Sequence, residues 1–177
     1  MKPLRLLAIG EVEDGVLPFL RSALEQYLQV PCEIIPAVLD PLAAFHADRG
    51  QYHSSQLLAA MQEFANEESW RVLGVADVDL YIPILTFVFG EAQTEGTCAL
   101  VSGRRLRQEF YGLAPDQRLL ERRLLKEAIH EIGHTCGLTH CENYLCAMAA
   151  SHAVEWIDIK DAGLCYECRE KLESFLE

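Results

Sequence analysis

The sequence has no long apolar run. None of its segments approaches the roughly 20 consecutive apolar residues that a membrane-spanning helix needs. The apolar stretch within residues 1–9 is too short for a signal peptide, and it fits a first β-strand instead. We therefore expect a cytoplasmic protein that has no membrane partner.

Basic residues are also scarce. The chain carries 15 Lys and Arg against 27 Asp and Glu, which gives a formal net charge of −12 at pH 7. The only basic runs are 104–107 and 122–123, and we interpret them as solvated faces of a helix or a loop. Nucleic acids and anionic membranes bind to basic surfaces, so we expect neither as a partner.

Several common functional patterns are missing too. The sequence has no internal repeat, no low-complexity tract, no phosphate-binding glycine loop and no serine nucleophile motif. The length of 177 residues, with 50% hydrophobic and 24% charged residues, is typical of a single globular domain. We expect that domain to span residues 1–177.

What the sequence does contain is a metal-binding pattern, His-Glu-Ile-Gly-His-Thr-Cys-Gly-Leu-Thr-His. On a helix, His130 and His134 lie one turn apart on one face, so both imidazoles can reach a single metal ion. Glu131 lies beside them, within reach of a metal-bound water. Two ligands and a general base are therefore predicted in one helical turn.

The same pattern predicts a third ligand. Gly137 lies where the helix must end, and a glycine adopts positive φ there without a Cβ clash. The chain then turns and brings His140 back to the metal. The fourth position stays open for water or substrate, as in catalytic zinc sites.

We interpret this set as the active site of a zinc-dependent metallopeptidase. Three neutral nitrogen donors leave zinc strongly Lewis acidic, so its bound water ionises near neutral pH. Glu131 takes that proton as the water attacks the peptide carbonyl, and it then protonates the leaving amine. A chance match of surface histidines is the alternative, but the glycine and the third histidine at fixed offsets argue against it.

Seven cysteines in a cytoplasmic chain argue against a disulfide framework and toward metal. Cys141 and Cys146, with the C-x-x-C pair Cys165 and Cys168, make four thiolates that fit a closed, structural zinc site. Such a site would organise a C-terminal subregion over 141–177. The alternative is a redox pair at the C-x-x-C motif, which leaves the first two cysteines unexplained. The other three are predicted to be small buried residues: Cys32, Cys98 and Cys136.

The rest of the chain alternates strands and helices, which predicts an α/β fold. Strands are predicted over residues 4–9, 32–38, 71–76, 86–92 and 98–102. Helices are predicted over residues 16–28, 54–66, 168–176 and from Pro115-Asp116 into the histidine pattern. Residues 40–50 are predicted to be a loop, and 154–159 have no clear preference.

Two further features carry open alternatives. Strand 86–92 is either a sheet edge that holds a peptide substrate by strand addition, or an ordinary inner strand. Asp77 and Asp79 either contribute to a cation site or are solvated residues and caps at the end of a strand, and the spacing favours the second reading.

The histidine pattern followed at once by Cys141, then Cys146-Ala147-Met148 and Cys165-x-x-Cys168, resembles the archaemetzincins, a metzincin-like family of zinc metallopeptidases. Segments 77–81 and 87–92 are also similar to strands of that family. The resemblance implies a compact α/β domain with a mixed twisted sheet, an active-site helix and a Met-turn beneath the catalytic zinc.

The resemblance also implies two zinc ions and a role for each motif residue. Glu131 matches the general base, and Met148 matches the Met-turn residue. Residues 149–153 lack the tyrosine that some metzincins use to assist the transition state, so stabilisation of the oxyanion is left to zinc, to the backbone or to an unidentified group. His152 is a weak candidate for that group, and we favour the alternative that it is a solvated loop histidine. The implied ligands are His130, His134 and His140 for the catalytic zinc, and Cys141, Cys146, Cys165 and Cys168 for the structural zinc.

Two rival functions remain at this point. One is a non-proteolytic or gated zinc-binding protein with a metzincin-like site, and the other is a purely structural two-zinc module. The second leaves Glu131 without a purpose. Our leading hypothesis is the peptidase, with a peptide or protein as its substrate and a monomer as the expected state.

Overall fold

The structure is a computed structural model that describes residues 2–176. Its large sheet has the strand order β2-β1-β5-β8-β7, in which β7 is antiparallel to β8 and the other neighbours are parallel. These strands are β1 (Leu4–Ile9), β2 (Cys32–Leu39), β5 (Arg71–Ala76), β7 (Gly90–Ala92) and β8 (Cys98–Ser102). A small sheet contains β3 (Phe45–His46), β4 (Gln51–His53) and β6 (Leu80–Tyr81).

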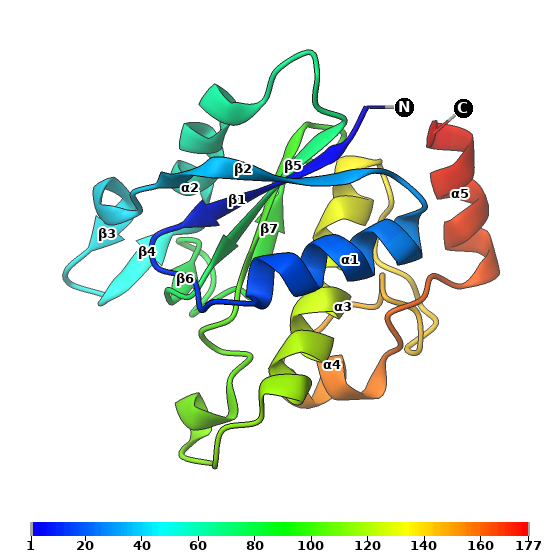
Figure 1. Cartoon of the computed structure of the whole chain (residues 1–177). Coiled ribbons are helices and arrows are strands. Elements are labelled where there is room, and N and C mark those ends of the chain that lie inside the picture. The colour runs from blue at the N-terminus through cyan, green and yellow to red at the C-terminus, as the bar shows by residue number, and fades with distance from the viewer. Residues whose placement is uncertain (1, 177) are drawn as a thin grey trace.

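Helices cover both faces of the large sheet. Figure 1 shows the sheet between α2 on one side and α1 with α3 on the other. This layering confirms the predicted α/β fold with a mixed sheet. The helices are α1 (Val16–Leu28), α2 (Ser54–Met61), α3 (Gln117–Thr135), α4 (Val154–Ile159) and α5 (Tyr166–Leu176).

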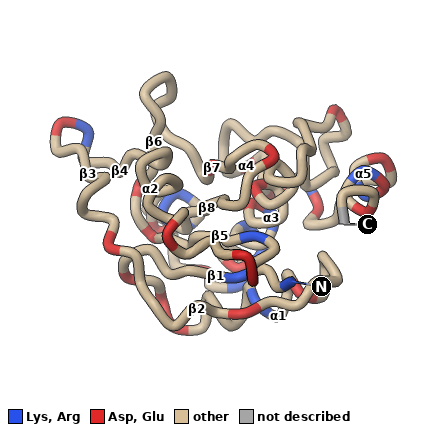
Figure 2. The backbone as a smooth tube through the Cα atoms, turned by 90° about the horizontal axis from the view of Figure 1, so that it is seen from above, with Lys and Arg blue, Asp and Glu red and all other residues tan. Residues whose placement is uncertain are grey.

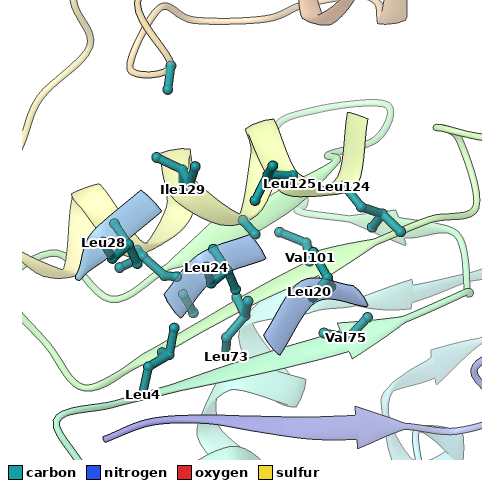
Figure 3. Close-up of a cluster of buried hydrophobic side chains, with 14 of the residues drawn as sticks. Leu4, Leu20, Leu24, Leu28, Leu73, Val75, Val101, Leu124, Leu125 and Ile129 are labelled. Atoms are coloured by element: carbon teal, nitrogen blue, oxygen red, sulfur yellow. The ribbon is translucent and has the colours of Figure 1, made fainter. Parts of the chain in front are cut away.

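Successive side chains of each strand point to opposite faces of the sheet, so the sheet has a separate core on each face. In β5, Leu73 and Val75 pack toward α1 and α3, whereas Val72 and Ala76 pack toward α2. Figure 3 shows the first of these cores, where leucines of α1 meet leucines of α3 above the strands. Burial on both faces explains why the central strands are almost entirely apolar.

Helix α3 carries the histidine pattern, and its position is fixed at several points. The side chain of Asp116 caps its N-terminus by accepting a hydrogen bond from the Leu119 amide at 2.9 Å. Buried Arg123 pairs with Asp158 of α4 at 2.6 Å and donates to the Leu106 carbonyl. The solvated face predicted for residues 122–123 is therefore wrong at Arg123.

The basic run at 104–107 is also ion-paired. Arg105 pairs with Asp79 at 2.6 Å, and Arg107 pairs with Asp77 at 3.0 Å. Each of the two aspartates is thus neutralised by an arginine of the protein. Arg105 and Arg107, which we expected to be solvated, are instead ion-paired just after the end of β5. Figure 2 shows the remaining charge spread over several separate segments.

Several predicted ranges differ from the structure. The loop at residues 40–50 contains a 3₁₀ turn at Leu42–Ala44 and strand β3, and helix α2 ends at Met61 before a 3₁₀ turn. The predicted strand 86–92 is shortened to β7. The Thr86 carbonyl accepts hydrogen bonds from the side chains of Arg49 and Gln51, and Val88 forms an isolated bridge to Leu80 of the small sheet. Within residues 2–176, no helix is long and apolar enough to cross a membrane.

Gly74 marks where α2 comes close to the sheet. A Cβ at this position would lie 2.6 Å from Ile9 Cδ1 and 2.8 Å from Met61 Sδ. We expect Gly74→Ala to lower the free energy of unfolding by about 1–3 kcal/mol, because overpacking forces side chains off their rotamers. Denaturant unfolding at constant zinc measures this. Gly163→Ala is the control, because its Cβ would meet no atom within 4 Å, and equal losses in the two variants would contradict the assignment.

Candidate active site

Three histidines converge at the C-terminal end of α3. The Nε2 atoms of His130 and His134 lie 3.1 Å apart, and donor atoms of these two residues and His140 all lie within 4.8 Å of one another. Two nitrogens that each lie about 2.0–2.1 Å from one tetrahedral zinc are roughly 3.3 Å apart. The spacing of the two helical donors therefore fits a single zinc ion.

The other ring nitrogen of each helical histidine is fixed by the backbone. Nδ1 of His130 lies 2.8 Å from the Ala147 carbonyl oxygen, and Nδ1 of His134 lies 2.7 Å from that of Leu138. A carbonyl only accepts hydrogen bonds, so Nδ1 carries the proton in both rings. Nε2 is then left with its lone pair, which is the form that binds a metal.

The turn after α3 supplies the third histidine as predicted. Gly137 has φ of 78°, and its amide donates to the His134 carbonyl at 3.0 Å while the Leu138 amide donates to the Gly133 carbonyl at 3.0 Å. These bonds close the helix end and reverse the chain. The ring of His140 then lies 5.0 Å from that of His134, measured between centroids.

Burial keeps the imidazoles neutral. It lowers the pKa of His130 to about 2, with Lys160 as the next cause, and it lowers the pKa of His134 and of His140. Neutral imidazole is the protonation state that coordinates a metal. The three rings are therefore in the protonation state that binds a metal.

Glu131 lies in the floor of a cleft of about 430 Å³ between α3, residues 85–92 and residues 150–152. Burial raises the pKa of its carboxyl well above the usual range, and the nearby Glu127 raises it further. Gly90 makes room for it, because a Cβ there would lie 2.8 Å from Glu131 Cγ and 2.6 Å from the Leu100 carbonyl oxygen. The carboxylate is thus held between α3 and β7.

Met148 is fully buried beneath α3. A Cβ on Gly133 would lie 2.4 Å from Met148 Sδ. The helix therefore needs a glycine at this point, one residue before His134, so that the methionine can approach it. The methionine that the resemblance assigns to the Met-turn therefore lies against α3, beside the histidine pattern.

The four predicted cysteines also converge. Their sulfur atoms lie within 4.8 Å of one another, and those of Cys141 and Cys165 are 3.8 Å apart. Thiolates about 2.3 Å from one tetrahedral zinc are roughly 3.8 Å apart. Cys146 Sγ accepts hydrogen bonds from the Met148 and Cys165 amides at 3.5 and 3.3 Å. A backbone hydrogen bond from Cys168 lowers the pKa of Cys165, whereas burial raises the pKa of Cys168.

The remaining predicted residues are also placed. Cys32, Cys98 and Cys136 are buried, as expected. His152 is exposed, but it lines the cleft and its ring contacts that of Trp156 edge to face at 5.7 Å between centroids. Strand β7 lies at the edge of the large sheet, so the inner-strand alternative is wrong.

Sequence reasoning missed two charged residues beside the site. Glu127 lies one helical turn before Glu131, lines the cleft and is buried, and its i, i+4 spacing could have identified it. Lys160 is fully buried and pairs with Glu127 at 2.8 Å. No pattern in the sequence points to Lys160, because the segment around it has no clear periodicity.

The geometry agrees with comparisons to known proteins. The model of Peptidase family M54 matches residues 20–174. The archaemetzincin of Methanocaldococcus jannaschii is 44% identical over 165 residues, which cover 93% of this chain and 89% of that protein. The chain belongs to the archaemetzincin family.

Solved structures agree with this assignment. A zinc-dependent peptidase from Methanocorpusculum labreanum superposes with a TM-score of 0.87 at 31% identity, covering 96% of this chain and 99% of that chain. The archaemetzincin of Methanopyrus kandleri gives 0.84 at 34% identity, with 99% and 95% covered. As a member of this family, the chain is a zinc-dependent metallopeptidase, a hydrolase of peptide bonds. The two donor clusters correspond to two zinc sites.

The contact between Gly133 and Met148 gives a test of the Met-turn. Replacing a helical glycine with alanine normally stabilises by about 0.5–1 kcal/mol. Here we expect Gly133→Ala to lower the free energy of unfolding by about 1–3 kcal/mol, because the new methyl group overlaps Met148. In a Met148→Ala background the same change should become neutral or stabilising. Denaturant unfolding of the four proteins measures the coupling, and additive effects would contradict the contact.

Proposed function

We propose that His130, His134 and His140 hold the catalytic zinc and that Glu131 is the general base of peptide hydrolysis. The single observation that carries this proposal is the convergence of three neutral nitrogen donors with a buried carboxylate in one cleft. The donor set fits zinc, because imidazole nitrogen is a preferred zinc ligand and three such donors leave a position open.

Zinc held at this site supplies Lewis acidity, which makes water nucleophilic near neutral pH and polarises a peptide carbonyl. Glu131 accepts a proton from the attacking water, because its carboxylate lines the cleft beside His130 and His134. It then delivers the proton to the nitrogen of the leaving amine as the C–N bond breaks. Met148 packs against α3 at Gly133, one residue before His134.

We propose that the substrate is a peptide segment in extended form along β7. The Phe89 carbonyl accepts from the Ser102 amide, and the Gln93 amide donates to the Cys98 carbonyl, so these two residues face β8. By the alternation of an antiparallel pair, the backbone groups of Gly90 and Ala92 point to the free edge. A substrate strand paired there would lie beside Glu131, whichever side chains it carries.

An open cleft favours the peptidase over the non-proteolytic and gated alternatives. The volume of about 430 Å³ lies directly over the histidines and Glu131, and this is where an extended peptide must place its scissile bond. A purely structural zinc module would have no use for a carboxylate buried at that point.

We expect Glu131→Gln to retain zinc at both sites and to reduce peptide hydrolysis by about 10²–10⁴-fold or more, because the amide has the same shape but takes no proton. Cleavage of a mixed peptide library, read by mass spectrometry beside zinc analysis, measures both properties. Glu121→Gln, at the other end of the same helix, is the matched control. Wild-type turnover in the Glu131 variant would contradict the mechanism.

We propose that Cys141, Cys146, Cys165 and Cys168 hold the structural zinc and that this ion organises residues 141–177. Support comes from backbone links between the two centres. Cys141 follows His140 directly, and its amide donates to the Met148 carbonyl at 3.0 Å. The thiolates need a reducing environment, so we also propose that the protein acts in a reducing compartment.

Cys165→Ser tests the link between the two centres. We expect the structural zinc to be lost and the catalytic zinc to bind more weakly, because the segment that contains His140 loses its anchor. Zinc titration with a competing chelator measures both affinities, and in the wild type the chelator should remove the open-site zinc first. Cys32→Ser, outside the cluster, is the control. If the catalytic zinc alone remained and bound with unchanged affinity, the two centres would not be coupled.

A further inference from the structure

Lys160 follows α4 and is the largest of the fully buried side chains, with an exposure of 1%. Its ammonium donates to the carbonyl oxygens of Ala147 at 3.1 Å and Ala149 at 3.2 Å. It also lies 2.8 Å from Oε1 of Glu127. That oxygen has no hydrogen bond of standard geometry within residues 2–176, so the third contact acts through charge.

A buried lysine calls for an explanation. Removing an ammonium from water costs free energy that only a full set of acceptors offsets, and an apolar side chain of similar volume often stabilises a fold as well or better. Lys160 has three N–H donors and three polar neighbours, two carbonyls and one carboxylate. Two carbonyls accept hydrogen bonds from the ammonium and the Glu127 carboxylate balances its charge, so the buried lysine is paired rather than isolated.

The acceptors of Lys160 belong to the Met-turn, where three consecutive carbonyls hold the metal-binding segments. The Ala147 carbonyl accepts from Lys160 and from His130 Nδ1. The Met148 carbonyl accepts from the Cys141 amide. The Ala149 carbonyl accepts from Lys160. Lys160 thus binds the backbone of the Met-turn on both sides of Met148, at Ala147 and at Ala149.

The third neighbour of the Lys160 ammonium is the carboxylate of Glu127. Glu127 lies on α3 one turn before Glu131, and its side chain lines the catalytic cleft. Through this ion pair, Lys160 connects the Met-turn to the helix that carries His130 and His134. One ammonium therefore contacts both the carbonyl that pairs with His130 and a carboxylate on the helix that carries His130.

We propose that Lys160 is a positioning residue for the catalytic centre: it holds the Ala147 carbonyl in place to orient His130, and it locks the Met-turn to α3 through Glu127. This inference rests on the proposed role of His130 as a zinc ligand. Lys160 itself acts through the turn and the histidine, and it reaches them from the segment that follows α4.

A second lysine serves as the control for a role that only links helices. Lys126 also links α3 to α4, because its ammonium donates to the Ile157 carbonyl at 2.9 Å and to the Asp158 carbonyl at 3.2 Å. Its acceptors lie on α4 and not on the Met-turn. Replacing Lys126 therefore removes a link between helices and leaves the carbonyl partner of His130 untouched.

The experiment uses Lys160→Met in the full chain, loaded with Co²⁺ alone at both sites. Only cobalt at the thiolate site shows sulfur-to-metal charge-transfer bands. Both sites show ligand-field bands, but those of the histidine site lie at shorter wavelength because nitrogen and oxygen donors give a stronger field than sulfur, so the two sites are read separately. We expect Co²⁺ affinity at the histidine site to fall about 10–100-fold, as for other partners of metal ligands, and its ligand-field bands to shift. The charge-transfer bands should stay unchanged, and Lys126→Met should change neither signal.

A second variant covers the case in which an unpaired Glu127 prevents folding. Glu127→Gln combined with Lys160→Met removes both charges and leaves no buried ion without a partner, and the same loss at the histidine site is expected. Wild-type affinity and spectrum at that site in either folded variant would overturn the proposal. Loss of both cobalt signatures together in both variants would also overturn it, because it would indicate a general folding role.

The proposed function is tested separately in the same samples. Wild-type protein that binds cobalt at both sites but cleaves no peptide when loaded with zinc would contradict the catalytic assignment, while the spectra would still decide the role of Lys160. Wild-type protein that shows no cobalt bands from the histidine site would overturn both.

Discussion

The active site depends on two hydrogen bonds from histidine Nδ1 to backbone carbonyls. His130 donates to Ala147 and His134 donates to Leu138. Because these carbonyls belong to segments that follow α3 in the chain, the helix alone cannot orient its own ligands. The helix supplies the one-turn spacing, and the segments after it supply tautomer and ring orientation. We therefore expect metal binding at α3 to depend on the order of the C-terminal part of the chain.

The Met-turn transmits that coupling. It contacts Gly133 of α3 through Met148, accepts a hydrogen bond from the Cys141 amide, and is held by Lys160. The catalytic and four-cysteine centres consequently share a short stretch of backbone. We propose that this arrangement lets the four-cysteine site, when it holds its metal, stiffen the histidine site.

Much of this could be predicted from the sequence because its periodicities are simple. Strands β1, β5 and β8 and helix α1 match their predicted ranges, since β-strand burial and helical spacing leave clear patterns. The ligand sets follow from local spacing, and the structure brings both together. Long-range polar contacts leave no such pattern. Lys160 and Arg123 are buried only because partners distant in sequence meet their charges, and the Thr86 carbonyl accepts hydrogen bonds from side chains of the β3–β4 region.

The central claim, that backbone carbonyls fix the tautomer of the two helical histidines, is tested most directly by ¹⁵N NMR of the histidine side chains in the zinc-loaded protein. The account predicts that His130 and His134 both carry the proton on Nδ1 and bind through Nε2. A protonated Nε2 with metal bound through Nδ1 in either residue would contradict it.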